Sequence, residues 1–316
     1  MAERRLAVVA VGGNALIRSR NEIGLDDQYA AVVATAAHLV DLIAAGWRMV
    51  VTHGNGPQVG FILRRSEIAG REAPAVGLPY AVGDTQGAIG FMFQNALGNA
   101  MRRRGIDRPV VALVTQTVVE RDDPAFAAPD KPIGAHMERE TAERLAAEFG
   151  WRIAEDAGRG WRRVVASPAP CDIIEAPLID RLVRDDVVVI ACGGGGIAVT
   201  ARENGELVAV DAVVDKDRTS ALLAARLGAD MLLIPTGVEQ VAIHFGTPQQ
   251  RWLDHLDMAE ARRLLADGHF GAGSMAPKIE TMLAYLARCP EGVGLITTPE
   301  AIGRAIAGEA GTRFTR

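Results

Sequence analysis

The stretch LAVVAVGGN, residues 6–14, places six apolar residues directly before a glycine pair and an asparagine. The stretches MVVTHGNG (49–56) and VVVIACGGGG (187–196) repeat this order. Glycine after a buried strand lets backbone N–H groups approach an anion closely, because no Cβ blocks the way. Ligands of an open parallel sheet bind at the carboxyl ends of its strands. The three stretches therefore predict an α/β fold with one crevice in which backbone amides bind phosphate.

Apolar β-type runs alternate with helical patterns along most of the chain, which predicts βαβ units around a mostly parallel sheet. The helix after the first glycine pair is expected to begin at an N-cap, Asp26 or Asp27, and to end before Gly46. Further helices are expected over about 58–69 and 85–104.

The alternation breaks between about residues 122 and 167. The sequence DDPAFAAPDKPIG (122–134) is rich in proline, and a short helix is expected over about 138–149. Trp151 and Trp161 suggest hairpins, and the aromatic content is too high for a solvated linker. We therefore predict a small protruding, lid-like subdomain within a single domain that spans residues 1–316.

Composition argues against several classes of protein. The 316 residues are 49% hydrophobic and 23% charged, as in an ordinary folded protein, and the formal net charge of −5 argues against a nucleic-acid partner. No apolar stretch reaches the ~20 residues of a membrane span, and the start of the chain does not have the pattern of a signal peptide. Cys171, Cys192 and Cys289 lack CxxC spacing, so neither a disulfide framework nor a zinc site is expected. We expect a cytoplasmic protein without a membrane partner.

Two lysines lie at expected helix starts, where a cation opposes the helix dipole by ~0.3–1 kcal/mol unless an anion is bound there. Lys216 lies between Asp215 and Asp217 before a helix expected over 218–227, with Asp217 as its N-cap, and Lys278 lies in the sequence GSMAPK. Together with the glycine loops, they predict a bound polyphosphate. The alternative is that each lysine is a surface charge paired with acidic neighbours. Lys131, between two prolines, adds a weaker signal.

These parts are typical of a phosphoryl-transfer site, in which catalysis consists mostly of positioning and electrostatic stabilisation. The sequence contains no GxxxxGK[ST] and none of the HRD and DFG motifs of protein kinases. It also offers no convincing general base. A carboxylate-like nucleophile is ionised at pH 7 and needs no base, so an acceptor of the carboxylate or carbamate kind is favoured over an alcohol.

Two rival readings concern the third glycine stretch. Gly193, Gly195 and Ala198 match GxGxx[GA], a dinucleotide-binding fingerprint, but that motif needs a helix directly after the glycines. The sequence TARENGELVAV (200–210) instead predicts a hairpin. A nucleophilic Cys192 is also conceivable, although a small buried residue at a strand end is the better interpretation.

Several motifs along the chain resemble those of the carbamate kinases, a branch of the amino-acid kinase superfamily. They are VGGNAL (11–16), HGNGPQVG (53–60), DKPIG (130–134), ACGGGGI (191–197) and VVDKD (213–217). The resemblance covers essentially the whole chain. It implies a three-layer αβα sandwich with a mostly parallel eight-stranded sheet, a protruding subdomain and a homodimer. It also implies reversible phosphoryl transfer between Mg·ATP and carbamate, which yields ADP and carbamoyl phosphate.

The resemblance further implies roles for individual residues. Lys216 would stabilise the transition-state charge, Asp217 would hold it in place, and Lys131 would reach the same phosphoryl group from the lid. The nucleotide would lie beside Lys278, Ser274, Met275 and Asp215, with Mg²⁺ held through the ATP phosphates rather than by a protein metal site. The carbamate and the phosphates would be bound by the glycine loops, namely by Gly12, Gly13, Asn14, Gly54, Asn55, Gly56, Gly194 and Gly195.

Two alternatives stay open. A related kinase could phosphorylate another carboxylate, such as acetylglutamate, which would call for an arginine in the acceptor pocket; Arg18 is the arginine nearest to the first two glycine loops in the sequence. A non-catalytic phosphate or nucleotide binder could share the fold, but a degenerate site would be expected to have lost at least one of four residues: Lys131, Lys216, Asp217 and Lys278. The expected use of the reaction is formation of ATP from carbamoyl phosphate.

Overall fold

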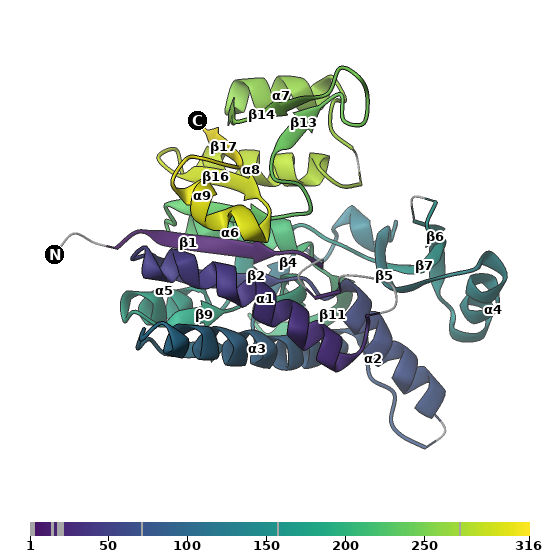
Figure 1. Cartoon of the computed structure of the whole chain (residues 1–316). Helices are drawn as coiled ribbons and strands as arrows, with labels where there is room; N and C mark the ends of the chain where they lie inside the picture. Colours follow the sequence, from purple (N-terminus) through teal and green to yellow (C-terminus); the bar gives the residue numbers. More distant parts are fainter. Residues whose placement is uncertain (1–3, 14–15, 18–21, 71, 157, 272) are drawn as a thin grey trace.

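A central sheet organises the molecule (Figure 1). The computed structural model describes residues 4–13, 16–17, 22–70, 72–156, 158–271 and 273–316. Within these residues the sheet has eight strands, parallel at every pairing except β16–β17. Their order is β15 (His255–Asp257), β17 (Thr312–Thr315), β16 (Val293–Thr297), β12 (Met231–Pro235), β1 (Leu6–Val11), β2 (Arg48–His53), β9 (Val188–Ile190) and β3 (Val110–Ala112).

Helices cover both faces of this sheet. Side chains alternate between the faces of a strand, so Ala7 and Val9 of β1 enter one core cluster and Val8 and Ala10 enter the other. The first cluster is covered by α1 (Leu25–Ala44), α3 (Leu78–Arg103) and α9 (Ile302–Ile306). The second is covered by α5 (Ala176–Arg184), α6 (Lys216–Arg226), α7 (Met258–Ala266) and α8 (Ala276–Arg288). The predicted three-layer α/β class with a mostly parallel central sheet is confirmed.

Helix ends differ from the sequence prediction in detail. The N-cap of α1 is Gly24, and the Asp27 carboxylate accepts the Gly24 N–H, so the predicted cap at Asp26 or Asp27 was wrong. Gly46, with φ of +86°, follows the helix as expected. The third helix begins at Leu78, earlier than expected, because Pro79 is tolerated in a first turn.

A second sheet packs beside the first and carries the third glycine stretch. It has the order β11 (Leu207–Val213), β10 (Ile197–Ala201), β4 (Gln116–Val119) and β8 (Pro170–Ile173). Strands β10 and β11 are antiparallel neighbours, and Gly205 in the turn between them has φ of +83°. A hairpin rather than a helix therefore follows Gly193–Gly196, which rules out the dinucleotide fingerprint.

Residues 131–165 form a separate small layer, which lies to one side of the main sheet in Figure 1. It contains a three-stranded sheet in the order β5 (Lys131–Met137), β7 (Trp161–Val165) and β6 (Arg152–Glu155), with α4 (Arg139–Phe149). It packs on α2 (Gly56–Ala69), where an added Cβ on Gly60 would lie 2.1 Å from Gly134 Cα. We refer to it as the protruding layer.

A two-stranded sheet, β13 (Val241–Ile243) and β14 (Arg251–Leu253), lies beside α7 at the top of Figure 1. Three short 3₁₀ helices complete the described structure: η2 (Pro124–Phe126), η3 (Gly193–Gly195) and η4 (Pro299–Ala301). In the described part of the chain, no helix combines the length and apolar character that crossing a membrane requires.

Candidate active site

The first two glycine loops meet at the carboxyl edge of the sheet. Strands β1 and β2 are parallel neighbours, so the loops that follow them lie side by side. A Cβ added to Gly54 would lie 4.0 Å from Gly13 N and 3.8 Å from the Lys216 side chain. The first loop, the second loop and the start of α6 therefore border one space. The predicted phosphate ligand Asn14 lies outside the described residues.

Asn55 joins the second loop to the third. Its side-chain amide donates to Thr85 Oγ1 at 2.8 Å and is buried. A Cβ on Gly194, which has φ of +64°, would lie 2.1 Å from Asn55 Nδ2. The Asn55 side chain thus spaces the two loops, and the third loop tolerates it only because residue 194 is glycine.

Gly195 carries the third loop to the start of α6. Its carbonyl oxygen accepts hydrogen bonds from Thr117 Oγ1 at 2.7 Å and Thr219 Oγ1 at 3.1 Å. A Cβ on Gly195 would lie 2.3 Å from Val214 O. Residues Gly193–Gly195 are buried, so this loop supports the strand end that precedes Lys216.

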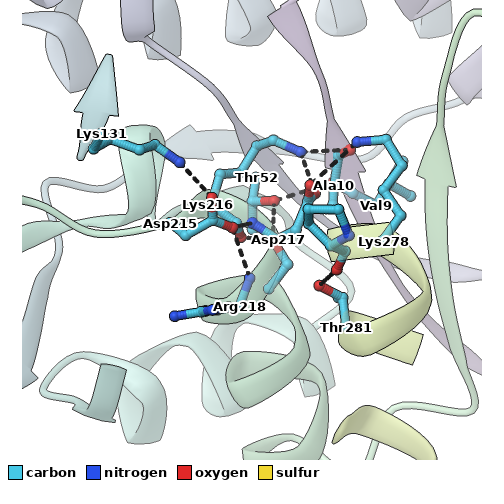
Figure 2. Close-up of polar contacts among 12 residues, drawn as sticks. Val9, Ala10, Thr52, Lys131, Asp215, Lys216, Asp217, Arg218, Lys278 and Thr281 are labelled. Carbon is cyan, nitrogen blue, oxygen red and sulfur yellow. Dashed lines mark hydrogen bonds and ion pairs between the residues drawn. The ribbon is translucent and has the colours of Figure 1, made fainter. Parts of the chain in front are cut away.

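Three lysines from three different elements converge on two aspartates (Figure 2). Lys131 of β5 forms an ion pair with Asp215. Lys216 Nζ of α6 lies 2.5 Å from Asp217 Oδ1, and Lys278 Nζ of α8 lies 3.3 Å from Asp217 Oδ2. This lysine–aspartate cluster carries more positive than negative charge, which suits a phosphate ligand.

The two aspartates orient the cluster. Asp215 is the N-cap of α6, since its Oδ1 accepts the N–H groups of Asp217 at 2.9 Å and Arg218 at 3.2 Å; the predicted cap at Asp217 was wrong. Burial by itself raises the pKa of Asp215, but Lys131, Lys216 and the N–H of Arg218 together outweigh it and hold that pKa well below its usual range. Burial also acts to raise the pKa of Asp217, and Lys216 and Lys278 reverse the shift. Both carboxylates are therefore anionic and available to hold the lysines.

Lys216 extends from α6 over the end of β1. Its Nζ donates to Ala10 O at 3.3 Å, in addition to its contact with Asp217 (Figure 2). Ser220, one turn further along α6, donates to Lys216 O at 2.7 Å and contacts Thr52 Oγ1 of β2 at 2.6 Å. The lysine is thus fixed to both strands that precede the first two loops.

His53 is a site residue to which sequence reasoning assigned no role, although it opens the HGNG motif. Its Nδ1 lies 3.1 Å from Gly54 O, its ring stacks on Phe93 with centroids 6.0 Å apart, and a Cβ on Gly193 would lie 2.5 Å from the imidazole. Burial lowers the pKa of His53 to about 4, and the charge of Lys216 acts in the same direction. A neutral imidazole therefore packs between the second and third loops.

A cavity of about 730 Å³ adjoins the lysine–aspartate cluster at Lys278. The cavity is lined by Ser274, Met275 and Lys278, the residues expected beside the nucleotide, together with His244 and Phe245. A second cavity, of about 530 Å³, shares Lys278 and extends to Gly12 and Gly13. Asp215, which is also expected beside the nucleotide, caps α6 and pairs with Lys131.

Cys192 lies beneath the site. Its thiol is buried, and burial raises the pKa of Cys192 to about 12. Because a thiolate is the reactive form of cysteine, this residue is an inert part of the core rather than a nucleophile.

Comparison with known proteins identifies the family of this chain. The model of the amino acid kinase family matches residues 5–293, so the chain belongs to that family. An N-acetylglutamate synthase from Neisseria gonorrhoeae shares the fold, at 17% identity and a TM-score of 0.52.

Within the family the chain groups with the carbamate kinases. It is 46% identical to the carbamate kinase-like protein YahI of Escherichia coli K12 over 316 residues, with 99% of each chain covered. It is 42% identical to carbamate kinase from Pyrococcus horikoshii, with 100% of each chain covered. Among solved structures, carbamate kinase from Giardia lamblia bound to AMP-PNP superposes with a TM-score of 0.91 at 36% identity, covering 100% of this chain and 99% of that one.

Proposed function

We propose that this chain is a carbamate kinase, which transfers a phosphoryl group reversibly between ATP and carbamate. The observation that carries the proposal is the lysine–aspartate cluster at the junction of the first two glycine loops and the cavity beside Lys278. The full-length identity of 42–46% to curated carbamate kinases and carbamate kinase-like proteins supports the same assignment. The physiological direction proposed is formation of ATP from carbamoyl phosphate.

In the mechanism that we propose, a carbamate oxygen forms a bond to the γ-phosphorus while the bond from phosphorus to the bridging oxygen of ADP breaks. Charge on the transferring group is spread over its equatorial oxygens, so fixed cations and N–H donors stabilise the transition state. Lys216 contacts the phosphoryl group from α6, Lys131 contacts it from the protruding layer, and Lys278 contacts the nucleotide phosphates. Carbamate is already anionic, so no side chain needs to remove a proton.

The aspartates act on the lysines rather than on the substrate. Asp217 accepts a hydrogen bond from Lys216 at one carboxylate oxygen and from Lys278 at the other. Asp215 accepts one from Lys131 and also caps α6. When phosphates enter, the lysines exchange part of this pairing for the anionic oxygens of the ligand. The ion pairs thus keep the cations in place before the substrates bind.

We propose that Mg²⁺ accompanies the nucleotide and supplies further neutralisation of its phosphates. The residues of the site fit a Mg²⁺ ion that is held through the nucleotide. The carboxylates of Asp215 and Asp217 already accept hydrogen bonds from lysines and backbone N–H groups, so they are not required as metal ligands. The phosphate oxygens of the nucleotide would accordingly provide most of the Mg²⁺ ligands. We also propose that the active species is a cytoplasmic homodimer, each copy a single domain with residues 122–167 as its lid.

The direct test is formation of ATP from ADP and carbamoyl phosphate with Mg²⁺, measured by coupling to hexokinase. Acetyl phosphate serves as the control donor. Rapid ATP formation with carbamoyl phosphate and little with acetyl phosphate is the expected result. Nucleotide binding without ATP formation from either donor would contradict the proposal and leave a kinase for another acceptor or a nucleotide binder.

A further inference from the structure

Arg162 reaches from the protruding layer to the second glycine loop. It lies on β7, and its side chain is only 11% exposed. A Cβ on Gly56 would lie 3.9 Å from Arg162 Nη2. Gly56 is the last glycine of the second loop and the first residue of α2. The guanidinium therefore faces the N-terminus of a 14-residue helix at the site.

The pairing of Arg162 within the protein is incomplete. Its Nη1 donates to Asp156 Oδ2 at 3.1 Å, but its Nε is buried and has no hydrogen-bond partner among the described residues. Asp156 is shared, because it also binds Arg159 Nη2 at 2.8 Å and His136 Nε2 at 2.8 Å. Burial acts to raise the pKa of Asp156, yet these three neighbours hold it at about 2. One carboxylate thus serves two guanidinium groups, which leaves positive charge in excess.

This arrangement is unfavourable without a ligand. The N-terminus of a helix carries partial positive charge, and a cation placed there is repelled by it. A buried guanidinium N–H without a partner adds a desolvation cost. An anion between Arg162 Nη2 and the second loop would relieve the charge repulsion, since the loop amides and the helix end are themselves donors to anions. The guanidinium group presents its N–H donors in one fixed plane, which suits an oxygen of a planar, carboxylate-type group.

A different cation lies beside each end of the second loop. Gly54 borders Lys216, in the lysine–aspartate cluster, whereas Gly56 borders Arg162. Lys131 and Arg162 come from neighbouring strands of one small sheet, since Lys131 of β5 pairs with Val165 of β7. The protruding layer thus presents one cation to the cluster and a second cation to the far end of the loop.

We propose that Arg162 is a substrate-binding residue that contacts the planar, carboxylate-type end of the phosphoryl acceptor. This inference rests on the proposed function. In carbamate, Arg162 binds the oxygen that does not attack phosphorus, and in carbamoyl phosphate the same atom is the carbonyl oxygen.

The test compares Arg162→Gln and Arg162→Lys with the control Arg159→Gln. Arg159 also forms an ion pair with Asp156, but its side chain is 56% exposed. This control therefore removes a solvent-exposed ion pair of the same carboxylate. We expect Arg162→Gln to lower kcat/KM for carbamoyl phosphate by about 10- to 100-fold, mainly through KM, because a hydrogen bond to a charged group is lost. Arg162→Lys keeps the charge but lacks the fork, so it should recover only part of the loss.

Binding of ADP, measured by calorimetry, and the melting temperature separate a substrate contact from a folding defect. The dissociation constant of ADP should change less than about twofold in Arg162→Gln, and Arg159→Gln should retain wild-type kcat/KM within about threefold. A folded Arg162→Gln enzyme with wild-type KM for carbamoyl phosphate would overturn the inference, as would an equal loss in Arg159→Gln. A wild-type protein that forms no ATP from carbamoyl phosphate would instead overturn the proposed function, and the inference with it.

Discussion

Lys216 shows how one side chain depends on its fixed partners. Its ammonium lies between Ala10 O and Asp217 Oδ1, so it is held in one position before any phosphate arrives. Preorganised charge of this kind stabilises a phosphoryl-transfer transition state without reorganisation during the reaction. The neighbouring Arg218 shares the first turn of α6, but its side chain is exposed.

We expect Lys216→Ala to lower kcat by about 10³-fold or more, because a cation that contacts the transferring group in the transition state is removed. The hexokinase-coupled assay measures the change, and circular dichroism checks that the fold is retained. Arg218→Ala is the matched control on the same helix turn and should keep kcat within about twofold. Turnover near the wild-type value in Lys216→Ala would refute the role given to this lysine.

His53 makes stability depend on pH. Burial lowers the folded-state pKa of His53 to about 4 from the ordinary 6.5, so the unfolded chain takes up a proton where the folded chain does not. This contribution to stability is therefore complete above pH 6.5 and is lost as the pH falls toward 4. Between pH 7 and pH 5 the loss amounts to about 2 kcal/mol.

We expect His53→Gln to remove the pH-dependent contribution of His53 to the free energy of unfolding. The free energy of unfolding, measured with urea at pH 7 and pH 5, should fall less in the variant than in the wild type over this interval. His255→Gln is the matched control, because His255 is exposed. An equal decrease in the wild type and in His53→Gln would show that this imidazole is not the titrating group.

At the scale of elements, the contact between α2 and β5 places the protruding layer. Gly60 and Gly134 let the two backbones approach so closely that a Cβ on Gly60 would lie 2.1 Å from Gly134 Cα. Such a contact is possible only between residues that lack a side chain. Because Lys131 begins β5, the same contact sets the position of that lysine relative to the cluster.

We expect Gly60→Ala to move β5 away from α2, to lower the melting temperature and to lower kcat by about tenfold or more, since small displacements of positioning groups are costly. Gly87→Ala in α3 is the matched control: nothing lies within 4 Å of its added Cβ, and alanine is favoured over glycine in a helix by ~0.5–1 kcal/mol. The control should melt at or above the wild-type temperature with unchanged kcat. A Gly60→Ala variant as stable and active as the wild type would show that the layer tolerates the displacement.

At the scale of the whole molecule, the site is assembled from all parts of the chain. The first two glycine loops follow β1 and β2, the cluster is built on α6, the cavity proposed for the nucleotide lies beside α8, and the protruding layer adds β5 and β7. The strand order places β1 and β2 side by side at the centre, so their loops meet although a helix separates them in sequence. Function therefore depends on the complete sandwich rather than on one motif.

The fold class, the glycine loops and the residues of the lysine–aspartate cluster could all be predicted from the sequence. These are encoded locally: apolar strands form the buried sheet, and glycine marks the turns that approach a ligand. Lys216 could be recognised because a cation at a helix start requires a negative partner. The family motifs then indicated the reaction. Figure 2 shows that Lys131 and Lys278 belong to the same lysine–aspartate cluster as Lys216.

Only the tertiary structure decided which partner each side chain meets. Asp215 rather than Asp217 caps α6, Asn55 donates to Thr85 between two loops, and His53 packs beside Gly193. Arg162 lies beside Gly56 because β7 is carried there by the packing of β5 on α2. Local sequence specifies the conformation of a segment, but contacts between distant segments follow from how all elements bury their apolar faces together, and no single stretch contains that information.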